Sequence, residues 1–175
     1  MTGQLPELET ARLRLRRPTV EDAPWIARMA ADYDVARMTA RMPHPYAEED
    51  ARRFLEAVPE QDPSTDLTWV MEDRAEGPIG VLAFFSEGWP APELGYWLGR
   101  PFWSRGYASE AVSAAIAFAE RDWRKKLVVA GHFADNPASG RVLEKAGFLY
   151  TGVVEHKFSL ARGEDAPLRR MVRLA

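Results

Sequence analysis

The chain has 175 residues and a formal net charge of −3, with 46% hydrophobic residues and no cysteine. This length and apolar content predict one packed domain over 1–175, with its core at 9–174, and exclude a disordered chain. The slightly acidic balance argues against a nucleic-acid-binding protein, and no apolar run is long enough to cross a membrane. Without cysteine there is no disulfide, zinc–thiolate site or thiol nucleophile. Because the N-terminus lacks a signal-peptide pattern, we expect a cytoplasmic protein.

The N-terminal part predicts one strand followed by two helices. Leu and Arg alternate at 11–17, as in a strand with one buried face. Thr19 opens a capping-box-like helix start with Asp22 three residues on, and a second helix is expected at 47–58. Between these helices, the segment 33–46 is rich in Met, Pro and aromatic residues and has no regular pattern.

The middle of the chain predicts an antiparallel meander. Strands are expected at 67–73, 79–85 and 93–98, with turn signals at 76–78 and 87–90 between them. These strands supply one part of the expected sheet.

The most informative stretch runs from Glu93 to Glu110, where an aromatic strand enters a short loop that opens into an Ala-rich helix at 106–121. Such a loop and helix start aim several backbone N–H groups at one point, where a phosphate or pyrophosphate binds well. Neither a P-loop nor a dinucleotide-binding fingerprint is present. The stretch therefore predicts an anion site of another kind.

The C-terminal part predicts an interior strand, a helix and further strands. The nearly unbroken apolar run at 127–133 is typical of a strand covered on both faces. Asn136 is expected to cap a helix that ends near Gly147. The last elements are a strand and a hairpin, at 148–154 and at 155–160 with 168–174. The order of elements predicts an α/β domain.

Three sequence motifs follow one another along the chain. They are ETARLRLRRPTVEDA, then GYWL with WSRGYASEA, and then NPASGRVLEKAGF. Over about residues 9–160 the chain resembles the GCN5-related N-acetyltransferases (the GNAT family), in particular the branch that acetylates ribosomal-protein N-termini (RimJ/RimL type). The resemblance implies an α/β (α+β) fold with a mixed, mostly antiparallel sheet of about seven strands and about four helices. It also implies a V-shaped gap between the fourth strand, 93–98, and the fifth, 127–133.

The resemblance implies acetyl-CoA as co-substrate, and the dispersed histidines predict no metal site. Main-chain N–H groups of the loop and first helical turn then hold the pyrophosphate, at Trp103, Ser104, Arg105, Gly106, Tyr107, Ala108 and Ser109. Trp103 replaces the usual Gln or Arg of the family's loop. Trp97 and Leu98 border the gap that admits the pantetheine arm, where a backbone N–H near Leu98 stabilises the oxyanion. Asn136 and Ser139 are expected to contact CoA from the next helix.

Three residues are candidates for catalysis. The resemblance places Ser139 near the CoA sulfur, as proton donor to the leaving thiolate. A general base has to take a proton from the attacking ammonium, and Glu93, His132 and water all remain open for this role. Alternatively, Glu93 is only a surface charge at the end of a strand. His132 is alternatively a histidine with a structural role. We expect the amine to attack the thioester directly in a ternary complex, and the lack of cysteine excludes a thiol-linked acyl-enzyme.

The resemblance implies a primary amine as the acceptor, either a peptide N-terminus or a small molecule. We expect its site between 33–46 and the hairpin loop 161–167, where both signs of charge occur. A non-catalytic acyl-CoA sensor or interaction module on the same fold is the alternative function. Both a monomer and a homodimer are compatible with the sequence, and neither a nucleic acid nor a membrane is an expected partner.

Overall fold

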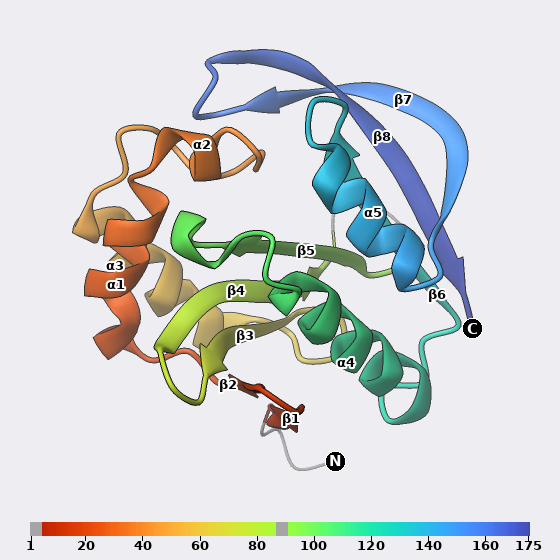
Figure 1. Cartoon of the computed structure of the whole chain (residues 1–175), viewed down its shortest axis with the longest axis horizontal. Helices are drawn as coiled ribbons and strands as arrows, with labels where there is room; N and C mark the ends of the chain where they lie inside the picture. Colours follow the sequence, from red (N-terminus) through yellow and green to blue (C-terminus); the bar gives the residue numbers. More distant parts are fainter. Residues whose placement is uncertain (1–4, 87–90) are drawn as a thin grey trace.

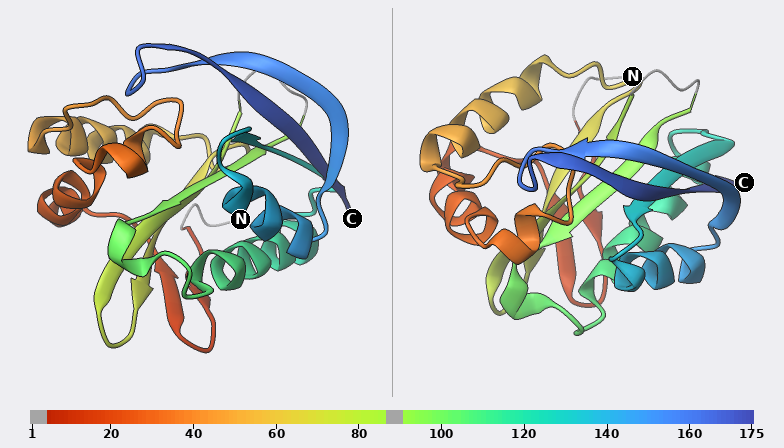
Figure 2. Two further views of the ribbon diagram at one scale, coloured as in Figure 1. Left: turned by 45° about the horizontal axis from the view of Figure 1, so that its top comes forward. Right: turned by 90° about the horizontal axis from the view of Figure 1, so that it is seen from above.

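Strand patterns from both halves of the chain meet in one sheet with helices on both faces (Figures 1 and 2). The computed structural model describes residues 5–86 and 91–175, so the turn expected at 87–90 lies outside the described residues. The strands are β1 (Leu8–Glu9), β2 (Leu13–Arg16), β3 (Leu67–Asp73), β4 (Gly77–Phe85), β5 (Glu93–Leu98), β6 (Leu127–Phe133), β7 (Leu149–Ser159) and β8 (Glu164–Leu174). The helices are α1 (Ala23–Ala30), α2 (Tyr33–Ala36), α3 (Glu48–Ala57), α4 (Tyr107–Arg121) and α5 (Pro137–Lys145).

The strand order in the described sheet is β1-β2-β3-β4-β5-β6-β8-β7. Among the strands of residues 5–86 and 91–175, only the β5–β6 pair is parallel, so the predicted mixed, mostly antiparallel sheet is confirmed. The predicted interior strand 127–133 is also confirmed, because β6 lies between β5 and β8. None of the helices among residues 5–86 and 91–175 is long and apolar enough to cross a membrane.

The structure differs from the predicted elements at three places. The two-residue strand β1 adds an eighth strand that is too short to give a pattern in the sequence. The predicted strands at 148–154 and 155–160 are one strand, β7, whose pairing with β8 shifts register between Tyr150 and Val154. The helix α2 forms in the segment expected to be irregular, where the Asp32 side chain caps it by accepting from the Asp34 N–H.

The two faces of the sheet pack against different helices (Figure 2). On one face, the fully buried residues Ala111, Ala115 and Ala119 of α4 join the main core. Their small side chains allow close contact between this helix and the sheet, as the Ala-rich sequence predicts. On the other face, α1 and α3 cover β3 and β4 and form a second apolar cluster.

Asp22 ties the first strands to the start of α1. Its carboxylate accepts hydrogen bonds from Arg16 Nη2 at 2.7 Å, the Thr19 N–H at 2.8 Å and Trp25 Nε1 at 2.9 Å. Burial raises the pKa of Asp22, but these hydrogen bonds outweigh it and hold the pKa below its usual value. The Thr19 contact is one half of the predicted capping box.

We expect Asp22→Asn to destabilise the fold by about 3 kcal/mol at neutral pH, because it removes one of the two carboxylates that pair with the half-buried Arg16 and leaves Glu72 as the other. Since the folded-state pKa of Asp22 is lowered, its contribution is present above the unfolded-state pKa of about 3.9 and is lost as the pH falls through the folded-state value. Urea unfolding at neutral and acid pH measures both effects. Glu48→Gln, which breaks only an exposed pair with Arg52, is the control. Equal stability of Asp22→Asn and the wild type at neutral pH would contradict this prediction.

The sheet splays between β5 and β6. These strands are in register at only two positions, Glu93 with Val129 and Leu94 with Ala130. Further along, β5 continues beside β4 but no longer pairs with β6. This gap, called the wedge below, is the V that the sequence predicts between 93–98 and 127–133.

Candidate active site

Backbone N–H groups of β5 face the wedge. The Pro92 carbonyl accepts a hydrogen bond from the Val129 N–H at 3.0 Å, so the backbone groups of residue 92 are turned toward β6. Backbone groups alternate in direction along a strand, so the N–H groups of Tyr96 and Leu98 are turned toward β6 as well. Because β6 has diverged there, the wedge presents donors that an extended ligand can pair with.

The loop between β5 and α4 presents further backbone donors. It turns through two residues with positive φ, Ser104 at 60° and Gly106 at 80°. Gly106 is the N-cap of α4, and the N–H groups of Tyr107, Ala108 and Ser109 lie in the first turn, where no carbonyl of the helix accepts them. Donors at a helix N-terminus form an anion site.

Side chains brace this loop from outside. The Trp103 indole Nε1 donates to the Leu98 carbonyl at 2.9 Å. The Arg105 guanidinium is paired with Glu76, and the Arg105 carbonyl accepts from Arg12 Nη1 at 2.9 Å. The loop is therefore held by Trp103 and Arg105. The Trp103 N–H, predicted to hold the pyrophosphate, donates instead to the Arg100 carbonyl at 3.2 Å, so the donors left for a ligand lie nearer the start of α4.

The start of α5 meets β5 across the wedge. Asn136 Oδ1 accepts from the Ser139 N–H at 3.3 Å, which confirms the predicted N-cap. Ser139 Oγ lies 2.8 Å from the Tyr96 hydroxyl oxygen. Burial raises the pKa of Tyr96 to about 12, against a smaller lowering by Ser139. Tyr96 is therefore protonated at neutral pH and can donate to Ser139 Oγ.

His132 lies under α5, and both of its ring nitrogens have partners. Nδ1 is 2.8 Å from the Phe133 carbonyl oxygen, and Nε2 is 3.0 Å from the Tyr150 hydroxyl oxygen. A Cβ placed on Gly140 of α5 would lie 2.8 Å from Nε2, so this helix packs directly onto the ring. These contacts are typical of a structural histidine, and catalysis by His132 stays a prediction.

Glu93 lies on the opposite face of the sheet from His132, because it is in register with Val129. Its Oε1 is 2.7 Å from Arg170 Nη1, and Arg170 Nη2 also contacts Glu155 at 2.5 Å. The Glu93 residue is only 6% exposed. Within the described residues, its second oxygen, Oε2, has no hydrogen-bond partner. Glu93 is thus a buried carboxylate at the cavity lining, and one of its oxygens has no hydrogen-bond partner among the described residues.

A cavity of about 1000 Å³ connects these groups. On the α4 and α5 side its lining includes Gly106, Ser109, Asn136, Ser139 and His132. On the α1 and α3 side it includes Glu93, Met42, Tyr46, Phe54, Phe85 and Trp97. The Trp97 ring packs 6.0 Å from the Trp25 ring, centroid to centroid. The sequence predicts that Trp97 borders the cofactor. Its ring, however, lies on the α1 side of the sheet.

The hairpin of β7 and β8 is joined to the segment after α2. Arg162 forms two hydrogen bonds with Asp135, at 2.8 and 2.9 Å, and its Nε donates to the Arg37 carbonyl at 2.8 Å. The Leu160 N–H also donates to the Ala40 carbonyl at 3.0 Å. The sequence predicts these two segments as borders of the acceptor site, and the hydrogen bonds bring them together.

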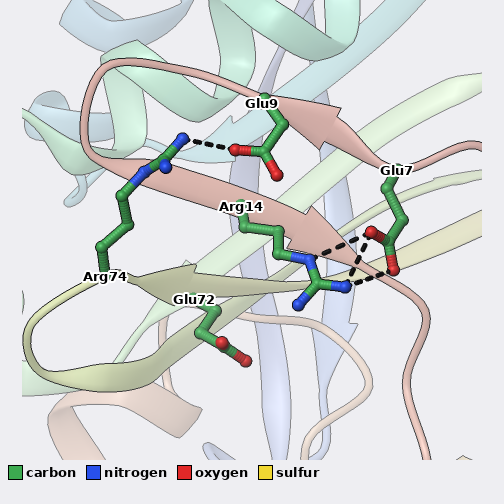
Figure 3. Close-up of a pocket in the computed structure, with 5 residues that line it drawn as sticks. All are labelled: Glu7, Glu9, Arg14, Glu72 and Arg74. Carbon is green, nitrogen blue, oxygen red and sulfur yellow. Dashed lines mark hydrogen bonds and ion pairs between the residues drawn. The ribbon is translucent and has the colours of Figure 1, made fainter.

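A second hollow of about 400 Å³ lies over β1, β2 and β3 (Figure 3). It is lined by ion-paired charges, including Arg14 with Glu7 and Arg74 with Glu9, which satisfy one another (Figure 3). No group of three or more His, Cys, Asp or Glu in the described ranges is arranged to hold a metal ion. The chemistry-bearing groups described above lie around the larger cavity.

Comparison with known proteins decides the family. The model for the acetyltransferase (GNAT) domain matches residues 12–149. The chain belongs to the GNAT acetyltransferase family. Uncharacterized N-acetyltransferase YoaA of Bacillus subtilis (strain 168) is 28% identical over 152 residues, which are 85% of this chain and 86% of that protein.

Solved GNAT structures share the fold. The RimL ribosomal L7/L12 alpha-N-protein acetyltransferase in complex with coenzyme A has a TM-score of 0.83 and 18% identity, covering 97% of this chain and 98% of that one. The microcin C7 self-immunity acetyltransferase MccE in complex with acetyl-CoA and AMP has a TM-score of 0.81 and 18% identity, covering 95% and 94%. The predicted α/β GNAT fold is confirmed, and the chain is a GNAT N-acetyltransferase.

Two partners of the candidate GNAT site are not among the predicted residues. Tyr96 is the hydrogen-bond partner of Ser139, and Arg170 is the ion-pair partner of Glu93. A tyrosine within an apolar strand needs a partner for its hydroxyl, and this is a signal that the sequence offers for Tyr96. The sequence offers no such signal for Arg170, because arginines also occur on half-exposed strands without a functional role, as at 11–17.

Proposed function

We propose that this GNAT chain transfers an acetyl group from acetyl-CoA to a primary amine by direct attack in a ternary complex. The proposal rests on one cavity. It has free helix amides on one side and an apolar pocket with a buried carboxylate on the other. Solved neighbours that contain coenzyme A or acetyl-CoA support a CoA thioester as the donor. Without cysteine, no thiol-linked acyl-enzyme forms.

The donor binds along the wedge. The amides of 106–109 hold the pyrophosphate at the start of α4. The pantetheine arm lies in the wedge, where its amides pair with the turned-out backbone of Tyr96 in the way of an added strand. The Leu98 N–H then stabilises the oxyanion of the tetrahedral intermediate. Asn136 borders the arm from α5.

Glu93 takes the proton from the attacking ammonium and Ser139 protonates the leaving thiolate. The Oε2 of Glu93 lies on the acceptor side and supports its role as base. Tyr96 donates to Ser139 Oγ and so leaves the Ser139 hydroxyl hydrogen free to point at the sulfur. The ion pair with Arg170 holds the Glu93 side chain in place.

We expect Ser139→Ala to lower turnover about tenfold, since a thiolate whose conjugate acid has a pKa of about 8.5 already leaves readily. Tyr96→Phe lowers turnover in the same direction but less, and the double variant is no slower than Ser139→Ala, because Tyr96 acts through Ser139. Thiol release at saturating substrates measures turnover. Ser113→Ala, at an exposed serine of α4 outside the cavity lining, is the matched control. If the losses of turnover in the two single variants added up in the double variant, Tyr96 would not act through Ser139.

The acceptor is proposed to be an amine attached to an apolar body. The floor of the cavity on the α1 and α3 side carries Met42, Phe54, Phe85 and Trp97. A peptide N-terminus, as in the RimL-type neighbour, and a small amine both fit this chemistry. The test is an acceptor screen by mass spectrometry that compares N-terminal peptides of apolar and acidic sequence with small amines. Acetylation of polycations alone would contradict an apolar acceptor.

A further inference from the structure

The strand β7 forms an exposed edge of the described sheet, as the last strand in its order. It carries Val153, Val154 and Phe158, which are 53%, 53% and 52% exposed, and the turn after it carries Leu160, which is 51% exposed. We call these four residues the β7 apolar edge. A long, exposed, apolar edge strand is a surface that pairs with another strand, and contiguous apolar patches mark interaction sites.

The backbone of β7 is oriented for such pairing. The Ser159 carbonyl accepts from Gly163 N–H at 2.9 Å within the hairpin, so residue 159 and every second residue before it face β8. The Pro167 carbonyl accepts from the Ala134 N–H at 2.8 Å and so faces β6, which makes its partner His156 a non-hydrogen-bonded position against β8. Both observations turn the N–H and C=O groups of Val154, His156 and Phe158 outward.

The side chains of this segment are complementary to themselves. In Val154-Glu155-His156-Lys157-Phe158, an apolar residue stands at each end and opposite charges flank the histidine. When two such strands run antiparallel about a two-fold axis at His156, Val154 faces Phe158 of the second copy. Glu155, which also contacts Arg170 of its own chain, then faces Lys157 of the second copy. Apolar and opposite-charge pairs directly across from each other stabilise antiparallel strands.

The parity of the backbone agrees with this register. The pairs centred on residue 156 place the outward-facing Val154, His156 and Phe158 opposite outward-facing residues of the second copy, which is the hydrogen-bonded arrangement of an antiparallel ladder. We propose that β7 pairs with β7 of a second copy of this chain, in antiparallel register centred on His156, so that the two sheets become continuous. Such a contact is isologous and closes on itself.

The first test uses charge. Val154→Lys places a lysine in the edge of both copies and should raise the dimer dissociation constant at least about tenfold in sedimentation velocity. Val20→Lys is the matched control, because Val20 is 55% exposed and lies outside β7. A strictly monomeric wild type, or equal dissociation of the two variants, would overturn the proposal. If the wild type is monomeric, a strand of another protein becomes the candidate partner of the β7 edge.

The second test uses the cysteine-free sequence to read the register. His156→Cys puts two thiols opposite each other at the axis, where a hydrogen-bonded pair has Cα atoms about 5.5 Å apart, within disulfide reach. Mild oxidation should link most of this variant into dimers. Leu149→Cys, at a residue 70% exposed in the same strand but far from the axis, should stay unlinked. Equal linking of both variants would overturn the register.

Discussion

Glu93→Gln should lower turnover about a hundredfold or more while leaving the dissociation constant for acetyl-CoA nearly unchanged. The amide cannot take the proton of the attacking ammonium, yet it has nearly the volume of the carboxylate. The side chain lies on the acceptor side of the sheet, away from the amides of 106–109, so acetyl-CoA binding is spared. Steady-state kinetics over a pH series and calorimetry with acetyl-CoA measure the two quantities separately.

The control for this variant is Glu155→Gln. Both Glu93 and Glu155 contact Arg170, so both variants disturb the same ion pairs. If loss of the pairing alone reduced activity, the two variants would be similarly slow. We expect only the Glu93 variant to lose the base-dependent limb of its pH–rate profile. An unchanged profile would transfer the role of base to His132 or to water.

Gly106→Val should weaken acetyl-CoA binding by about 2 kcal/mol, or about thirtyfold in the dissociation constant. At a φ of 80° a side chain is strained, and its Cβ would lie 3.3 Å from Arg12 Nη2, which braces the loop. Relief of this strain turns the first amides of α4 away from the pyrophosphate. Titration calorimetry measures the change.

Gly152→Val is the matched control for backbone strain. Gly152 has a φ of 82°, and a Cβ there meets nothing within 4 Å. Both variants should lose similar stability in thermal unfolding, whereas only Gly106→Val should lose affinity for acetyl-CoA. An unchanged affinity in Gly106→Val would contradict the anion site at this loop. Absence of acetyl-CoA binding to the wild type would contradict the proposed function as a whole.

Local patterns predicted the elements on which the site is built. Asn136 followed by proline predicts a capped helix, and the cap forms because a side-chain oxygen and an amide three residues on meet without any tertiary contact. Gly106 before an Ala-rich run predicts a loop entering a helix, since it has the positive φ that such a turn requires. In the same way, the apolar run at 127–133 predicts an interior strand.

Elements without a local pattern could not be predicted in this way. The strand β1 has two residues and forms only because β2 offers it an edge. The helix α2 is a single turn held by its Asp32 cap within a segment whose composition favours a loop. The continuity of β7 depends on its pairing with β8, which absorbs the register shift near Gly152.

The sequence by itself determined most of the elements, the loop that enters α4, the helix cap at Asn136 and the resemblance that implies the family. Each of these depends on residues close together in the chain, whose preferences act before the fold is complete. Only the tertiary structure decided which side chains meet: Tyr96 with Ser139, Glu93 with Arg170, and Arg162 with Asp135. These partners are far apart in sequence and are brought together by the order of the strands and the divergence of β5 from β6, which no local pattern encodes.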